Sequence, residues 1–130
     1  MRKLITLFGI APLLLSGCKV YSSKYKALLL VTTNNGNSAT MSFEEFEGTY
    51  VFKLKKQNKG ESDIKFAASL ESGKINVEYY AFNNESNLFT ISGGETLNDH
   101  SGYIEHGYKV SIIVTAEEKA INGHLTFNLD

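Results

Sequence analysis

The sequence predicts an all-β fold, an antiparallel β-sandwich of about seven to eight strands, with a small β-barrel as the alternative. Two patterns support this fold class. Apolar and polar residues alternate with a period of two in several short segments, for example at residues 49–54. Clusters rich in glycine or asparagine separate these segments at short intervals. In addition, no segment of useful length has the 3.6-residue apolar period of an amphipathic helix.

The first expected elements lie at residues 27–47. The apolar run at residues 27–33 predicts a buried strand, which stops at the turn signal of residues 34–37. Residues 39–47 are ambiguous, because Ser42 and Glu45 match a helix capping box but no apolar helical pattern follows them. We expect an irregular strand there, with a single helical turn as the alternative.

The middle of the chain contains three alternating segments. Glu71-Ser72-Gly73 separates the second segment from the third and predicts a β-hairpin, because glycine adopts positive φ without steric cost. The alternating residues expected to share the buried face of each segment are Tyr50, Phe52 and Leu54; then Ile64, Phe66, Ala68 and Leu70; then Ile75, Val77, Tyr79 and Ala81.

The last part of the chain predicts further short strands and the rest of the core. In order, we expect a strand at residues 88–92, a loop at 92–101, a short strand at 102–105, an alternating strand at 108–114, a turn at 117–122 before Gly123, and a final strand at 125–129. The residues expected to be buried together between packed sheet faces are Tyr50, Phe52, Phe66, Val77, Val110, Ile112, Leu125 and Phe127.

The N-terminus has the layout of a secretory signal peptide. Arg2 and Lys3 precede an uncharged apolar stretch at residues 4–15, and the small residues Ser16 and Gly17 follow it. A membrane-spanning helix needs roughly 20 apolar residues, and this stretch is shorter. An uncleaved membrane anchor is the alternative.

Leu15-Ser16-Gly17-Cys18 resembles the lipobox of bacterial lipoproteins. The resemblance implies cleavage before Cys18, attachment of a diacylglycerol to its thiol, and a protein anchored by acyl chains on the extracytoplasmic side of the cell membrane. The expected organisation is a signal peptide at 1–17, lipidated Cys18 with a short tether to residue 24, and a β-sandwich domain at 25–130. The glycine-spaced strands are similar to those of small envelope lipoproteins, a loose group that mostly lacks an assigned function.

The charge of the mature chain argues against nucleic-acid binding. Removal of residues 1–17 leaves 11 lysines against 14 acidic residues, whereas a nucleic-acid binder needs a concentrated basic surface. Cys18 is the only cysteine, so no disulfide can form within the chain.

Motifs that carry catalysis or cofactor binding are missing from the sequence. There is no G-x-S-x-G nucleophile elbow, and no G-K-[S/T] follows Gly93-Gly94 as a phosphate-binding loop would require. We therefore expect no catalytic residues, no bound metal, no cofactor and no enzymatic activity. The alternative is a small enzyme or metal-dependent domain that uses Asp99, His100, Glu105 and His106, although their spacing does not enforce a metal geometry.

Two aromatic residues give the most specific hypothesis about a binding site. Tyr80 and Phe82 lie on the face of their strand opposite Tyr79 and Ala81. If that face is exposed, the two rings form a platform for an envelope protein or a wall glycan, because aromatic side chains supply large contact area with few rotamers. The alternative is that other segments, such as the N-terminal strand, cover this face.

Overall fold

The computed structural model describes residues 22–56, 61–81, 84–102, 104 and 109–129. Within these ranges the chain forms eight strands and no helix, and every strand pairing is antiparallel. The all-β antiparallel prediction is confirmed. The strands are β1 (Lys24–Leu28), β2 (Val31–Asn34), β3 (Ser38–Lys55), β4 (Ile64–Ser72), β5 (Lys74–Ala81), β6 (Asn84–Ser92), β7 (Thr96–His100) and β8 (Lys109–Leu129).

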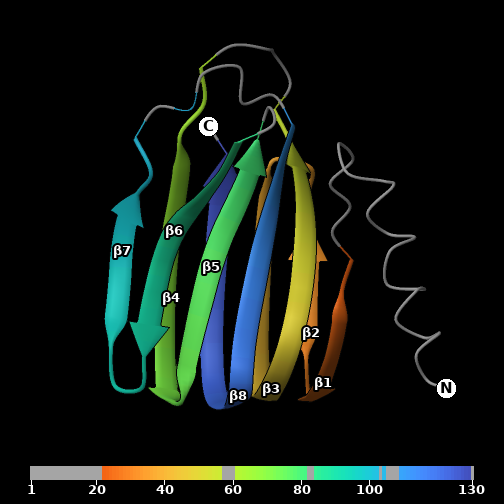
Figure 1. The fold of residues 1–130 in the computed structure, drawn as a ribbon, viewed down its shortest axis with the longest axis vertical. Coiled ribbons are helices and arrows are strands. Elements are labelled where there is room, and N and C mark those ends of the chain that lie inside the picture. The colour runs from red at the N-terminus through yellow and green to blue at the C-terminus, as the bar shows by residue number, and fades with distance from the viewer. Residues whose placement is uncertain (1–21, 57–60, 82–83, 103, 105–108, 130) are drawn as a thin grey trace, which may run out of the picture.

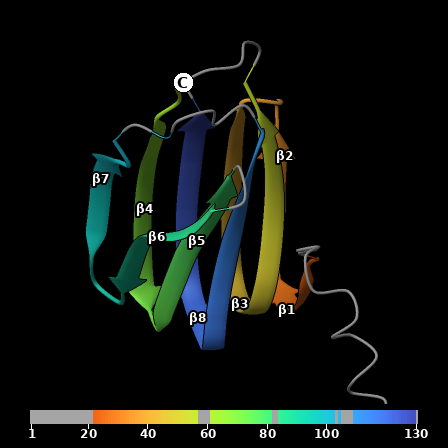
Figure 2. The same ribbon diagram turned by 45° about the horizontal axis from the view of Figure 1, so that its top comes forward.

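The strands form a two-layered sandwich, and the long strands β3 and β8 belong to both layers (Figures 1 and 2). The back layer has the order β7, β4, the C-terminal half of β8 and the N-terminal half of β3, with β2 outermost. The front layer has the order β6, β5, the N-terminal half of β8 and the C-terminal half of β3. Strands β2, β6 and β7 each pair on one side only, so the sheet is open and the barrel alternative is wrong.

The two long strands pass between the layers at a β-bulge. Phe46 pairs with Ala120 and Gly48 pairs with Ala116, so β8 contains two more residues than β3 between these pairs. Extra residues in one strand bend it and increase its twist. Gly48 has a φ of +118°, and a Cβ there would lie 2.5 Å from the Lys24 carbonyl oxygen. Only glycine therefore allows β1 to approach β3 this closely.

Aromatic rings from both layers meet in the core. Phe66 of β4 and Phe89 of β6 are stacked with centroids 4.5 Å apart, and Phe127 of β8 lies 5.9 Å from Phe52 of β3. Seven of the eight residues predicted to form the core are buried, as expected for alternating faces that pack against each other. Tyr50 is the exception, because it is half-buried and its hydroxyl oxygen lies 3.1 Å from that of Thr32.

The apolar run at residues 27–33 is not a buried strand, so that prediction is wrong. It is divided between β1 and β2 by a turn in which Leu29 has a φ of +52° and is 70% exposed. Both strands lie at an edge and pair only with β3. Thr32 pairs with buried Met41 and therefore faces the core, whereas Val31 faces outward and is 60% exposed.

Residues 39–47 belong to β3, and the register shifts at their end between Phe46 and Gly48, as expected for an irregular strand and not for a helical turn. Three other local predictions differ from the structure. The hairpin predicted at Gly73 is wrong, because β4 pairs with β7 and β8 whereas β5 pairs with β6 and β8. Strand β7 lies within the expected loop at 92–101. Residues 117–122 contain the bulge of continuous strand β8 instead of a turn between two strands. Turn-forming residues are tolerated here because β3 bends at the same point and remains paired with β8 on both sides of the bulge.

The signal peptide, Cys18 and the beginning of the tether lie outside the described residues. Among the residues that are described, no helix is long and apolar enough to cross a membrane.

We predict that Phe127→Ala lowers the free energy of unfolding by about 3–5 kcal/mol, as for other buried phenylalanines. Phe127 is 2% exposed, and its ring contacts rings from both sheet layers. Denaturant unfolding of the full chain measures the change, and Asn128→Ala is the control because Asn128 is exposed on the same strand. Equal stability of the two variants would contradict this account of the core.

Candidate functional site

The outer side of the front layer carries the candidate site. In β5 and β8, residues that face the core alternate with residues that face outward, so the outward set lies on one continuous surface. We call this surface the β5–β8 face. It is formed by Lys74, Asn76, Glu78 and Tyr80 of β5, by Lys109, Ser111, Ile113, Thr115 and Glu117 of β8, and by the outward residues of β6 and β3 beside them.

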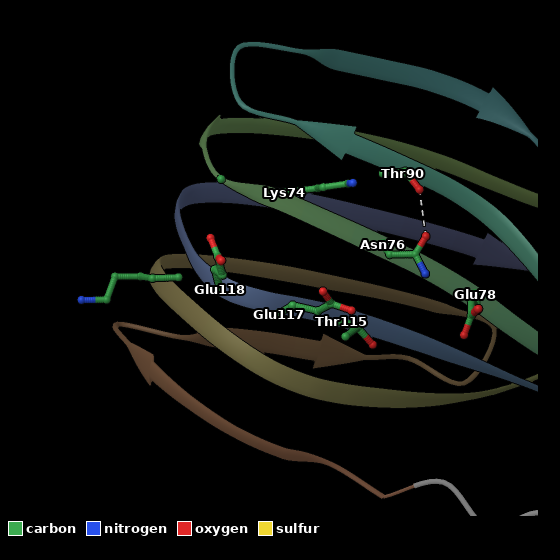
Figure 3. Close-up of a pocket in the computed structure, with 9 residues that line it drawn as sticks. Lys74, Asn76, Glu78, Thr90, Thr115, Glu117 and Glu118 are labelled. Atoms are coloured by element: carbon green, nitrogen blue, oxygen red, sulfur yellow. Dashed lines mark hydrogen bonds between the residues drawn. The ribbon is translucent and has the colours of Figure 1, made fainter.

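A row of amide and hydroxyl groups crosses this face. Asn76 pairs with Thr90 on one side and Thr115 on the other, and Thr115 pairs with Thr49 of β3. The Asn76 Oδ1 accepts hydrogen bonds of 2.8 Å from the Thr90 hydroxyl and from the Asn87 side-chain amide (Figure 3 shows the first). These two donors fix the orientation of the Asn76 amide, and its Nδ2 remains able to donate to a ligand.

The row lies within a hollow of about 700 Å³, which we call the polar hollow. Charged side chains of both signs line the hollow beside these uncharged groups. Figure 3 shows Thr115 and Glu117 on β8, and Glu78 on the neighbouring strand β5. The chemistry of this lining suits a ligand with many hydroxyl groups, because carboxylates accept hydrogen bonds while amides and hydroxyls both donate and accept them. The lining residues are Gly73, Lys74, Asn76, Glu78, Thr90, Thr115, Glu117, Glu118 and Lys119.

Ile113 lies at an outward position between the two ends of the face. Its neighbours Ile112 and Val114 point into the core, so Ile113 points outward, yet it is only 5% exposed. It lies between Glu78 of β5 and Val51 of β3, which pair with it on either side. Ile113 is therefore buried beneath its neighbours, and it is not among the described residues that line the polar hollow.

A second hollow, of about 510 Å³, lies at the end of the face where β5 and β3 end. Three of its side chains are the lysines Lys53, Lys55 and Lys109, so we call it the lysine hollow. No carboxylate is among the described residues that line it, and the others are Leu54, Tyr80, Val110 and Ser111.

The structure places Tyr80 on the face for which the aromatic platform was predicted. Tyr80 is half-buried, pairs with Ser111 of β8, and contributes to the lysine hollow. Phe82 lies outside the described residues, so the platform as a pair of rings stays a prediction.

Of the histidine cluster predicted as an alternative site, the structure describes Asp99 and His100. His100 has its Nδ1 3.3 Å from Asp63 Oδ1, whereas Asp99 Oδ1 accepts a hydrogen bond from the His100 backbone N–H. Asp63 Oδ1 also accepts hydrogen bonds from the Ser101 hydroxyl and the Gly102 N–H, at 3.2 and 2.9 Å. Asp63 thus holds together the chain that follows β7, a structural role that the sequence did not reveal.

The remaining members of that alternative, Glu105 and His106, lie outside the described residues. Within the described ranges, no group of three or more histidine, cysteine, aspartate or glutamate side chains could hold a metal ion.

The sequence interpretation missed Asn76, Thr115 and the three lysines as parts of one surface. Alternation placed Asn76 and the lysines at outward positions, whereas Thr115 lay beyond the expected strand at 108–114, and adjacency across strands depends on register. The usable signal was that Asn76 and Glu78, two neighbouring outward residues of β5, belong to residue types that are depleted in strands.

No protein-family model matches the sequence, and comparison with curated proteins also gives no match. Solved structures with a similar fold do exist. TmCBM61, in complex with β-1,4-galactotriose, has a TM-score of 0.54 at 16% identity, over 83% of this chain and 87% of that one. A structure described as CBM4 has a TM-score of 0.47 at 13% identity, over 83% of this chain and 79% of the other. A family 29 carbohydrate-binding module complexed with mannohexaose has a TM-score of 0.42 at 14% identity, with the same two coverages.

The likeness to TmCBM61 concerns the fold. It shows that this chain shares the β-sandwich architecture of that structure over most of both chains. At this level of identity it does not carry over any residue of a binding site.

We predict that Tyr80→Ala lowers the free energy of unfolding by only about 1 kcal/mol, because the ring lies on the outer face of a strand. The matched control is Tyr79→Ala, since Tyr79 is the adjacent residue and packs against the core. We expect that control to cost clearly more, about 3 kcal/mol. Chemical denaturation measures both, and a Tyr80→Ala variant as unstable as Tyr79→Ala would exclude Tyr80 from an accessible binding surface.

Proposed function

We propose that the protein is a membrane-anchored envelope lipoprotein whose folded domain is a non-catalytic module that binds a glycan on the β5–β8 face. The observation that carries the proposal is the polar hollow, in which a row of oriented amide and hydroxyl groups crosses a β-sheet.

This combination of groups matches a sugar. A sugar ring has hydroxyl groups around its edge and apolar C–H surface on its faces. Oriented side chains such as Asn76 and Thr115 can exchange hydrogen bonds with the hydroxyls, and the half-buried Tyr80 ring provides apolar contact. Because the hollow lies on paired strands and not on loops, its groups are fixed before the ligand arrives, which reduces the entropy lost on binding.

The similar fold is compatible with the same ligand class. TmCBM61 was determined with a galactose oligosaccharide bound, and it shares the β-sandwich architecture with this chain. Because folds host unrelated functions, this likeness supports the proposal only together with the polar hollow.

The anchoring part of the proposal rests on the N-terminal sequence. The resemblance of residues 15–18 to a lipobox supports a domain on the extracytoplasmic side of the membrane, attached through Cys18. The described chain reaches β1 at Lys24, six residues after Cys18, and six extended residues span at most about 20 Å. The domain would therefore work close to the membrane surface, where it could hold a wall polymer or a glycan-bearing partner.

We predict that the full-length protein, purified in detergent, binds at least one neutral or charged polysaccharide, and that Asn76→Ala weakens this binding about five- to tenfold. The change removes the oriented amide at the centre of the polar hollow, and one hydrogen bond contributes about 1 kcal/mol. Affinity electrophoresis against a polysaccharide panel identifies the ligand, and calorimetry measures the change.

The matched control is Asn128→Ala, because Asn128 is exposed on β8 in the back layer, far from this face. Equal loss of affinity in both asparagine variants would contradict the location of the site. Shortening of the polymer during incubation would instead contradict the non-catalytic part of the proposal, and binding to envelope proteins alone would favour a protein partner.

We predict that Cys18→Ser abolishes incorporation of a labelled fatty acid while the domain still folds. The thiol is the attachment site that the lipobox resemblance implies, and the described core contains no residue near position 18. Metabolic labelling of bacterial cultures measures incorporation, and circular dichroism measures folding. Label that persists in the Ser variant would exclude lipidation at this residue.

A further inference from the structure

The large apolar side chains that the described part of the chain exposes all lie in one short segment near its beginning. They are Tyr25, Leu28, Leu29 and Val31, and each is at least 43% exposed. Tyr25 differs from the others, because its ring lies 5.8 Å from that of Phe46 at the border of the core. We call the other three the apolar edge. Exposed apolar surface gathered in one place commonly marks contact with a partner or a membrane.

The core does not account for the positions of these three side chains. Val31 points outward, as described above, and Leu28 pairs with Glu45, the outward neighbour of buried Phe46 on β3. Leu29 lies between β1 and β2 with a φ of +52°, a left-handed conformation that leucine adopts only at an energetic cost. Its side chain is the most exposed of the three, so burial does not offset this cost.

The same edge is poorly suited to pairing with a further strand. Within the described ranges, β1 and β2 pair only with β3, they have five and four residues, and the chain is interrupted between them. Lys24 and Lys26 of β1 are both exposed. Short strands, interruptions and lysines are the features by which proteins prevent edge-to-edge pairing. A surface that contacts side chains alone therefore fits this edge better than a second copy that adds a strand.

The lipid attachment site is close enough for this surface to be the bilayer. Cys18 precedes Lys24 by six positions, which span at most about 20 Å, and Leu29 follows Lys24 by five, about 17 Å along a strand. The chain can therefore turn back so that Cys18 and Leu29 reach the same bilayer surface. Tethering over so short a distance raises the effective concentration to about the millimolar range, so a weak contact is sufficient.

Charges of both signs surround the apolar edge. Glu45 has its Oε1 3.4 Å from the Nζ of Lys119, and Glu47 lies opposite Lys26 in the register of β1 and β3. Glu44 is exposed. This mixture does not select an anionic headgroup, so apolar insertion at the boundary between headgroups and acyl chains would carry the contact.

We propose that the apolar edge lies against the bilayer that holds Cys18, with Leu28, Leu29 and Val31 inserted at the level where the acyl chains begin. This inference rests on the anchoring part of the proposed function, and it adds a second contact, made by the protein itself. Figure 1 shows β1 and β2 at the edge opposite β7. Because β3 and β8 lie between β1 and β5, the polar hollow would be held about 10–15 Å from that edge.

The test uses the absence of tryptophan from the sequence. Lipidated protein carrying Leu29→Trp is reconstituted into phosphatidylcholine vesicles that contain lipid brominated near the top of its acyl chains. Asn98→Trp is the matched control, because Asn98 is exposed on edge strand β7. We expect the bromolipid to remove most of the fluorescence of Leu29→Trp and to leave that of Asn98→Trp unchanged. Adding phosphatidylglycerol should not alter this result, since the contact is apolar.

A further variant separates insertion by the apolar edge from the affinity of the tryptophan reporter itself. Leu28→Ser/Val31→Ser, combined with Leu29→Trp, should lose the quenching, because only the reporter then remains apolar. The melting temperature should not change, since both side chains are exposed. Polysaccharide binding should also remain the same, because neither residue belongs to the β5–β8 face.

Equal fluorescence of the two reporters in brominated vesicles would overturn the inference and leave the anchoring and glycan-binding proposals standing. Quenching that survives Leu28→Ser/Val31→Ser would overturn it as well, because the reporter alone would then make the contact. Dimers cross-linked through this edge, without quenching, would also overturn it and assign the edge to a second copy. Purified protein that carries no fatty acid would contradict both the anchoring proposal and this inference.

Discussion

The structure depends on the continuous pairing of β3 with β8 while both strands pass from one layer of the sandwich to the other. The pairing extends from Ser38 with Asn128 to Lys55 with Lys109, with one irregularity at the bulge. A strand that crosses between layers would lose backbone hydrogen bonds if its partner did not bend at the same point, and each unpaired buried group costs free energy. Gly48 and the extra residues of β8 allow both strands to bend together.

This crossing also positions the candidate site. Because the N-terminal half of β8 lies between β3 and β5 in the front layer, outward side chains from all three strands form adjacent rows. The residues next to these outward ones in each strand point inward and fill the core. Among them, Ile112 and Val114 of β8 are fully buried. The rigidity of the packed core is therefore transmitted directly to the groups on the β5–β8 face, such as Asn76 and Thr115, which are attached to the same strands.

The outward residues of this face differ from those on the other side of the sandwich. Ile113 occupies an outward position on β8 but is only 5% exposed, so it is buried beneath its neighbours. Lys55 and Lys109 are paired across β3 and β8 at the end of the face. On the opposite side of the sandwich, β4 and the C-terminal half of β8 present Ser69, Thr126 and Asn128 at outward positions, as an ordinary solvated sheet does.

The sequence by itself determined the fold class, most of the core and the outward or inward direction of most side chains, because the period of two is a local property of a strand. It also located the chain reversal at Gly73, whose φ is +98°, but it could not show that the two flanking strands enter different layers and do not pair with each other. Tertiary structure alone decided that residues 38–55 and 109–129 are single strands, that Val31 is exposed while Thr32 faces the core, and that Lys53, Lys55 and Lys109 are neighbours. The physical reason is that alternation gives the face of each residue, whereas the partner of each residue depends on strand order and register. These depend on contacts between segments far apart in the chain, such as the pairing of Lys55 with Lys109.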